Sequence, residues 1–208
     1  MMNFPDDMYE VDKALIKYPK AFNKVAAWQG WPALCAVGPS RTGKTRACLQ
    51  ALNAYQDDGT VYWQGKERGP SIYMVSGSKL FREVSTALWD HEEDQWLSRW
   101  TERARGGLYT ISKTFTIDGA RGQSPEFKVV PPVIFIDEMD KWVFEPKANS
   151  LLYDLFNIMF VNKCNYITTT NAGPKWWQER MGEEFVARLM GSELDPVGDR
   201  PVRVDFTM

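Results

Sequence analysis

Short runs of apolar residues alternate with longer segments of helical periodicity along most of the chain. The apolar runs that we expect to be buried strands span residues 31–37, 71–76, 131–138 and 165–171. Apolar residues recur at helical spacing, which predicts helices, in residues 44–55, 79–104 and 149–163. Because buried strands alternate with helices, the pattern favours an α/β fold in which a mostly parallel sheet carries helices on both faces.

The remaining segments predict smaller elements. Charged residues at 91–94 divide the 79–104 segment, so it forms either one long helix or a helix pair. Residues 108–118 alternate apolar and polar side chains, and after turn residues at 119–125 we expect a return strand at 126–130. Further expected elements are a polar-tipped excursion at 60–70, one or two short helices in 174–190 and a strand at 201–206.

We expect the chain to have two parts. Residues 1–28 form a short helical leader that is broken near Pro19, and residues 29–208 form one core domain. The core carries a basic, hairpin-like insert at about 99–130. With 208 residues, the chain is long enough to bury a full hydrophobic core.

Composition removes several classes of protein. Hydrophobic residues make up 44% and charged residues 25% of the chain, which is typical of a globular protein. The net charge of −2 means that any nucleic-acid surface must be local. Three cysteines without a CxxC pair and a single histidine disfavour a Cys/His metal site and a His-based triad, and they favour a reduced, cytoplasmic protein. No run of 18 apolar residues exists, so we expect no membrane partner.

The clearest chemical signature is GPSRTGKT, which matches G-x-x-x-x-G-K-[ST] between an expected strand and an expected helix. Its glycines permit backbone torsions that aim successive N–H groups at phosphate oxygens, and the helix N-terminus adds positive charge. We expect Lys44 to reach the β- and γ-phosphates of ATP and Thr45 to place its hydroxyl on Mg²⁺. The expected phosphate-binding residues are Gly38, Pro39, Ser40, Arg41, Thr42, Gly43, Lys44 and Thr45.

A second signature is VIFIDE, an apolar run that ends in two acids. Asp137 is expected at the carboxyl edge of the sheet, where an Mg²⁺ ligand belongs and where it also contributes to nucleotide binding. Glu138 follows and can polarise a water molecule for attack on the γ-phosphate. We interpret Asp140 as a loop charge. The sequence therefore predicts a metal site made by Thr45 and Asp137, with Glu138 as a catalytic residue.

Two weaker signals follow further along the chain. Asn171 ends the expected strand ITTTN, where it can hold the attacking water or sense the γ-phosphate; the alternative is a turn-forming asparagine. Arg188 lies on an expected helix and can act as an arginine finger in a neighbouring subunit's site; the alternative is a surface salt bridge to Glu183 or Glu184. The N-K-x-D motif of GTPases and the L-S-G-G-Q motif of ABC ATPases are absent, which leaves an ATPase that uses Glu138.

The order of these parts resembles the DnaC/IstB branch of the AAA+ ATPases, which contains bacterial and phage helicase loaders and transposition helper ATPases. The resemblance runs from about Trp31 to Gly191. It rests on GPSRTGKT, SIYMVSGSKLFREV, VIFIDEMDKW, LLYDLFNIMFVNKCNYITTTN and RMGEEFVARLMG. It implies a P-loop AAA+ core of the ASCE type, and the short stretch after Gly191 agrees with the family's frequent lack of a C-terminal lid domain.

The resemblance also implies roles for the residues that match the family's motifs. The matches are Lys44 and Thr45 of Walker A, Asp137 and Glu138 of Walker B, Asn171 as sensor and Arg188 as the trans-acting arginine. Members form ATP-dependent rings or spirals on DNA, which implies a homo-oligomer in a bacterial or phage-infected cytoplasm. The leader is too short for the partner-binding domain that many loaders carry in front of the core, which puts direct recruitment of a helicase in doubt.

The insert between the second and third expected core strands carries a local basic excess in an acidic chain. Its DNA-contacting candidates are Arg99, Arg103, Arg105, Lys113 and Arg121. Tyr109 and Phe115 are available to stack on bases. The alternative is a solvated hairpin whose charges only keep its surface in water.

These observations predict an ATP- and Mg²⁺-dependent ATPase that assembles on DNA, completes its site between subunits, and loads or remodels a replication helicase or a transposase. Two alternatives stay open. One is a viral Rep-type DNA helicase motor, since those proteins also end a strand in asparagine after the Asp-Glu pair. The other is a non-catalytic assembly protein that ATP only switches.

Overall fold

The computed structural model of the chain describes residues 17–28, 33–58, 61–63, 66–68, 72–105, 107–117, 120–130, 132–191 and 201–207. Five strands form the central sheet in the order β4-β7-β8-β1-β9. They span Ile72–Ser76 (β4), Val133–Asp137 (β7), Asn165–Thr170 (β8), Leu34–Val37 (β1) and Val202–Asp205 (β9). Every neighbouring pair in this sheet is parallel, which confirms the prediction from the alternating pattern.

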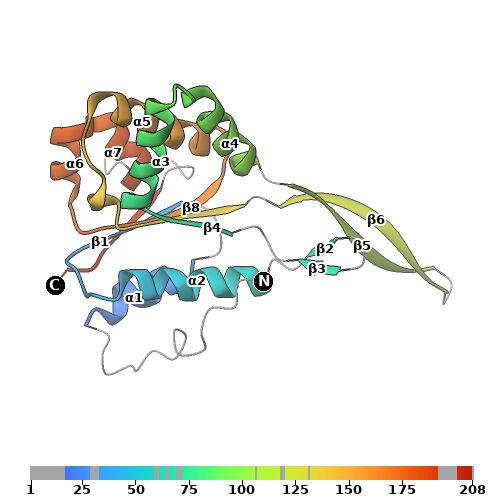
Figure 1. The fold of residues 1–208 in the computed structure, drawn as a ribbon. Coiled ribbons are helices and arrows are strands. Elements are labelled where there is room, and N and C mark those ends of the chain that lie inside the picture. Colours follow the sequence, from blue (N-terminus) through green and yellow to red (C-terminus); the bar gives the residue numbers. More distant parts are fainter. Residues whose placement is uncertain are drawn as a thin grey trace.

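Helices cover both faces of the sheet (Figure 1). One face carries α1 (Pro19–Ala26) and α2 (Lys44–Asp58). The other face carries α3 (Gly77–Trp89), α4 (Glu93–Arg105), α5 (Pro146–Val161), α6 (Pro174–Met181) and α7 (Glu183–Met190). The expected helices are therefore present, and α2 runs three residues further than its apolar spacing predicted.

The central strands β1, β7 and β8 are buried on both faces because each separates two apolar cores. In β1, Cys35 and Val37 pack into the core under α3 to α7, whereas Leu34 and Ala36 pack into the core under α1 and α2. This explains why the strands appear in the sequence as continuous apolar runs instead of alternating ones. The carboxyl ends of β1, β7 and β8 consequently meet at one edge of the sheet.

Residues 79–104, for which the sequence allowed one long helix or a helix pair, belong to a helix pair. Helix α3 begins after Ser76, whose hydroxyl accepts a hydrogen bond from the Lys79 amide at 3.2 Å. It ends at Trp89, and the chain turns through His91, whose φ of 55° lies in the left-handed region, before α4 starts. The charged residues at this turn thus mark the break between the two helices.

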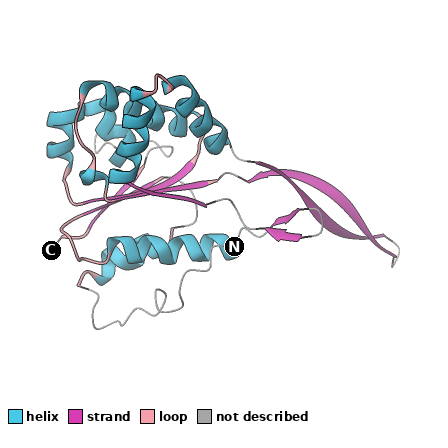
Figure 2. Cartoon of the chain, in the orientation of Figure 1, coloured by secondary structure: helices cyan, strands magenta, loops and turns pink. Residues whose placement is uncertain are grey.

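A long two-stranded ribbon projects from the body of the molecule (Figure 2). Its strands β5 (Gly107–Ile117) and β6 (Ala120–Val130) pair in antiparallel register along their full length. The predicted hairpin is present, but the return strand begins at residue 120 and not at 126. The 60–70 excursion is a smaller antiparallel pair, β2 (Val61–Trp63) and β3 (Lys66–Arg68).

The leader is described only from residue 17 onward, and there α1 starts at Pro19. The break that the sequence predicted near Pro19 is therefore a helix start. The leader residues 1–16 lie outside the described part of the chain. The division into a leader and a core with a basic insert stays a prediction. Within the described residues, no helix has the length and apolar character needed to cross a membrane.

Candidate functional site

The phosphate-loop segment connects β1 to α2 at the carboxyl edge of the sheet. Two of its glycines adopt conformations that a side chain would resist, with φ of 148° at Gly38 and 91° at Gly43. The Gly38 amide donates to the Thr170 carbonyl at 3.1 Å, and the Thr42 hydroxyl donates to the Pro39 carbonyl at 2.9 Å. These contacts hold the loop against β8 and leave a concave surface in front of the N-terminus of α2.

A cavity of about 380 Å³ lies at this surface. Its lining residues are Ser40, Arg41, Thr42, Gly43, Lys44, Thr45, Arg46, Glu138, Thr169 and Asn171. They come from the phosphate-loop segment, from the end of β7 and from the end of β8. The size falls in the range of small-ligand pockets. The structure therefore brings most of the predicted phosphate-binding residues, Glu138 and Asn171 to one cavity.

Lys44 is the central cation of the cavity. Its ammonium group donates to the carbonyl oxygens of Gly38 and Pro39 at 2.7 Å each and to Asn171 Oδ1 at 2.9 Å. These three bonds use all three of its protons. Burial lowers the Lys44 pKa below its ordinary value, while the nearby carboxylates of Asp140 and Asp137 act to raise it. A phosphate that enters the cavity must therefore replace acceptors that the chain itself now supplies.

Asp137 and Thr45 converge as the sequence predicted. The Thr45 hydroxyl donates to Asp137 Oδ1 at 2.9 Å, which joins the start of α2 to the end of β7. A hydroxyl and a carboxylate are hard oxygen ligands, and the pair fits an Mg²⁺ ion. In the described part of the chain, no three His, Cys, Asp or Glu residues converge as a metal site. An ion held by Thr45 and Asp137 would therefore complete its shell with phosphate oxygens and water.

Thr169 of β8 is a residue of this site that the sequence analysis missed. Its hydroxyl donates to Asp137 Oδ1 at 2.5 Å and accepts a hydrogen bond from the Glu138 amide at 2.9 Å. Thr169 is only 1% exposed. It thus fixes the carboxylate of Asp137 and the backbone of Glu138 together. The threonine run ITTT was the available signal, because buried hydroxyl groups need partners.

Glu138 is placed with its side chain exposed at the rim of the cavity. Its φ of 51° is left-handed, which is unfavourable for a residue with a side chain. The surrounding hydrogen bonds hold it there, with Thr169 accepting from its amide and its carbonyl accepting from the Lys141 amide at 2.9 Å. Strained backbone of this kind persists where the structure over-determines it and is concentrated at functional sites.

Asp140 is the second missed residue, and interpreting it as a loop charge was wrong. It lies on the short 3₁₀ turn Met139–Lys141 that follows Glu138. Its carboxylate accepts from the Asn171 backbone amide at 2.7 Å and from Asn171 Nδ2 at 2.9 Å. Asn171 therefore bridges Asp140 and Lys44, and it is more than a turn residue. The sequence carried no signal for this contact, which only the pairing of β7 with β8 creates.

Arg188 lies on α7 and does not line the cavity of its own chain. Its Nε donates to Asn157 Oδ1 of α5 at 2.5 Å, and its guanidinium lies 4.6 Å from the centre of the Phe160 ring. Among the described residues it forms no salt bridge to Glu183 or Glu184, so that alternative is wrong. Its proposed part in a neighbouring subunit's site stays a prediction.

The DNA-contacting candidates divide between helix α4 and the β5–β6 ribbon. Arg99, Arg103 and Arg105 lie on α4, whereas Lys113 lies on β5 and Arg121 on β6, where the described structure covers the backbone only. Lys113 is registered with Ser124, and Arg121 with Thr116. The DNA-contacting role of these five residues stays a prediction.

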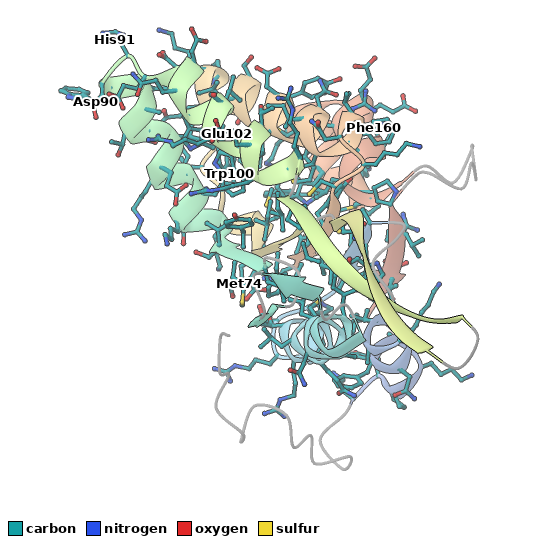
Figure 3. The ribbon with its side chains drawn as sticks, turned by 90° about the vertical axis from the view of Figure 1, so that its right-hand side faces the viewer. Met74, Asp90, His91, Trp100, Glu102 and Phe160 are labelled. Carbon is teal, nitrogen blue, oxygen red and sulfur yellow. The ribbon has the colours of Figure 1, made fainter. Side chains whose placement is uncertain are left out.

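A second cavity of about 520 Å³ lies between α3 and α4. Its lining residues are Lys79, Arg82, Glu83, Thr86, Ala87, Glu92, Trp96, Arg99, Trp100 and Arg103. Arg103 lies 4.8 Å from the centre of the Trp100 ring and 5.4 Å from that of Tyr73. Figure 3 shows Trp100 and Glu102 on α4, with Asp90 and His91 at the turn of the helix pair. The cavity is basic, with four cationic and two acidic lining residues.

Comparisons with known proteins identify the fold but no close relative. No protein-family model and no curated protein sequence matches the chain. A replication initiator DnaA bound to AMPPCP and single-stranded DNA matches with a TM-score of 0.56 and 11% identity, over 97% of this chain and 51% of that one. The DnaC helicase loader matches with a TM-score of 0.53 and 14% identity, over 89% of this chain and 86% of that one.

DnaI matches with a TM-score of 0.51 and 15% identity, over 98% of this chain and 95% of that one. The chain thus spans about half the length of the DnaA chains and most of the length of DnaC and DnaI. Identities this low establish the fold and leave the activity to be tested. The chain shares the fold of the DnaC helicase loader, DnaI and the matched part of DnaA, as the order of its motifs predicted.

Proposed function

We propose that this protein binds and hydrolyses ATP with Mg²⁺, assembles on DNA with its site shared between subunits, and loads or remodels a replication helicase or a transposase. One observation carries the proposal. Lys44, Thr45, Asp137, Glu138 and Asn171 come from three separate strand ends and converge at one edge of the sheet. The fold match to an AMPPCP-bound DnaA supports nucleotide as the ligand.

The chain's own residues divide the work of hydrolysis. Amide groups of the phosphate-loop segment and Lys44 bind the phosphates. Mg²⁺, held by Thr45 and Asp137, would neutralise phosphate charge. A water oxygen attacks the γ-phosphorus, the bond to the β–γ bridging oxygen breaks with its electron pair on ADP, and Glu138 accepts the proton from the water. The fixed backbone of Glu138 sets where its carboxylate stands.

Steady-state hydrolysis tests the proposal directly. We would measure turnover with no DNA, with single-stranded DNA and with duplex DNA, at several protein concentrations and fixed salt. Turnover that rises with DNA and more than linearly with protein supports a DNA-assembled ATPase with shared sites. Turnover that responds to neither would contradict assembly on DNA. Tight ATP binding without turnover under all conditions would favour an ATP-switched assembly protein, and strand separation without a partner would favour a helicase motor.

Three variants assign the roles. Lys44→Ala should abolish nucleotide binding, because the cavity loses its central cation. Glu138→Gln should retain nucleotide binding and lower turnover by about 10²- to 10⁴-fold. Arg188→Ala should lose turnover and regain part of it when mixed with the Lys44→Ala protein. Asn157→Ala is the matched control, since it removes the partner of Arg188 and keeps the guanidinium. Absence of rescue would exclude a trans-acting Arg188.

Nucleic-acid contact is proposed at the α3–α4 cavity. Its cationic lining suits phosphates, whereas Trp96 and Trp100 are each only 2% exposed and belong to the core. Arg82 and Arg99 line the cavity and are exposed, so their substitution by glutamine spares the packing that Arg103 makes on Trp100. We expect the double variant to bind single-stranded DNA more weakly and to lower the salt slope by about 0.7 per lost phosphate contact. Unchanged affinity and slope would contradict this surface.

A further inference from the structure

The side-chain amide of Asn171 lies between an ammonium group and a carboxylate. On one side Lys44 Nζ donates to its Oδ1 at 2.9 Å. On the other side its Nδ2 donates to one Asp140 oxygen at 2.9 Å, and its backbone amide donates to the other at 2.7 Å. A carboxylate only accepts hydrogen bonds and an ammonium group only donates them. The two neighbours therefore dictate which end of the amide faces which way.

We propose that Asp140 is a positioning residue that fixes the carboxamide of Asn171 so that its oxygen, and not its nitrogen, faces the nucleotide cavity. This inference rests on the proposed function and deepens it. Turning the amide by half a rotation would place its oxygen against Asp140 and its nitrogen against Lys44. Both contacts would then be repulsive, and two charge-assisted hydrogen bonds would be lost.

The orientation decides what Asn171 can do when ATP is bound. All three protons of Lys44 are committed, so a phosphate oxygen must displace one of its three acceptors, and in this proposal the displaced acceptor is Asn171 Oδ1. The released Asn171 keeps both bonds to Asp140, so its oxygen still faces the cavity. Phosphate oxygens are acceptors, and a carbonyl oxygen cannot donate to them. Asn171 is therefore set to accept a hydrogen bond from the attacking water and to hold that water next to Glu138, which takes the proton.

The position of Asp140 in the chain supports this role. It lies three residues after Asp137 and two after Glu138, on the turn that the backbone of Glu138 enters. Among the charged groups, Asp140 also has the largest effect in raising the Lys44 pKa against the lowering effect of burial. Asp140, Asn171 and Lys44 thus form one chain of hydrogen bonds that joins the end of β7, the end of β8 and the start of α2.

The test compares Asp140→Asn, Asn171→Ala and the double variant with wild type. Asp90→Asn is the matched control, because Asp90 is an exposed aspartate at the distant turn after α3. Asn at position 140 has both a donor and an acceptor, so Asn171 becomes free to turn. We expect Asp140→Asn to keep the AMPPCP dissociation constant within about threefold and to lower kcat about 10- to 100-fold. The double variant should match Asn171→Ala, since Asp140 acts only through Asn171.

A readout without nucleotide keeps the inference separate from the proposed function. In the wild-type protein, the Asn171 side-chain NH₂ should give a downfield, exchange-protected NMR signal, and Asp140→Asn should remove both properties. If the wild-type protein binds nucleotide without hydrolysing it, the proposed ATPase reaction is wrong. The NH₂ signal still tests whether Asp140 orients Asn171. The inference is overturned when the NH₂ signal is unchanged in Asp140→Asn, or when the two substitutions multiply in the double variant.

Discussion

Thr169 offers a sharp test of how the site is built, because its neighbour in the same strand is a natural control. Thr169 Oγ1 donates to Asp137 and accepts from the Glu138 amide. Thr168 is equally buried, yet its Oγ1 has no nitrogen or oxygen partner among the described residues. Valine is nearly isosteric with threonine. Thr169→Val therefore removes two hydrogen bonds, whereas Thr168→Val removes no hydrogen bond to a nitrogen or oxygen atom of the described residues.

The expected magnitude follows from those contacts. Thr169→Val removes a hydrogen bond to a charged group and leaves the Glu138 amide without its partner, which should cost about 2–4 kcal/mol. A typical domain is stable by about 5–15 kcal/mol, so the loss is large but leaves the protein folded. For a chain of this length it corresponds to roughly 5–15 °C in Tm. Thr168→Val should change the free energy of unfolding by less than about 0.5 kcal/mol, or stabilise slightly.

Urea unfolding at constant m-value and ATP hydrolysis are the assays. Thr169→Val should also lose turnover, since the backbone of Glu138 loses the contact that holds its left-handed conformation. Equal destabilisation by the two substitutions would refute the reasoning, because it would show that the loss comes from strand packing. Full turnover in Thr169→Val would refute the link between Thr169 and Glu138.

Three further predictions follow from the same structure. Gly38→Ala should lower the free energy of unfolding by roughly 2–4 kcal/mol, measured by thermal unfolding. A Cβ at Gly38 would lie 2.8 Å from both the Cβ and the carbonyl oxygen of Phe206, and the φ of Gly38 is 148°. An unchanged Tm would contradict this close contact. The three buried cysteines, whose thiol pKa values burial raises, should resist alkylation at pH 8 until the protein unfolds, and labelling of native protein would contradict their burial. Because burial lowers the folded-state pKa of Lys44 below 10.5, the unfolded chain binds more protons between the two pKa values. Wild-type stability relative to Lys44→Met should therefore rise with pH in that window, and a fall would contradict the direction of the shift.

The fold could be predicted from the sequence because the central strands β1, β7 and β8 lie between two cores. A strand buried on both faces has a continuous apolar run that stands out from the helices beside it. The ribbon was harder, since Gly122 and Pro125 looked like turn residues and stand inside β6. Proline lacks an amide proton, but both strands of an isolated ribbon are edge strands, where proline is tolerated. The turn-forming residues therefore led to a predicted start of the return strand at residue 126, whereas β6 begins at Ala120.

The candidate site could be predicted only in part, for a different reason. Lys44, Thr45 and Asp137 belong to motifs whose spacing along the chain fixes their chemistry. Thr169 and Asp140 act through partners that are distant in sequence, and only the pairing of β7 with β8 brings them together. A lone carboxylate after a strand carries no sign of which amide it will meet. Contacts of this kind follow from the assembled sheet and not from any local pattern.

The start of α3 has a consequence for communication between the two cavities. Gly77 opens this helix, and a Cβ added there would lie 2.5 Å from the Glu138 carbonyl oxygen. Helix α3, which forms one wall of the α3–α4 cavity, therefore packs directly against the backbone of Glu138, with no room for a methyl group between them. Thermodynamic linkage is reciprocal. If bound nucleotide shifts Glu138 and thereby tilts α3, it changes the affinity of the helix pair for its own ligand. That ligand must then change the affinity for nucleotide by the same factor.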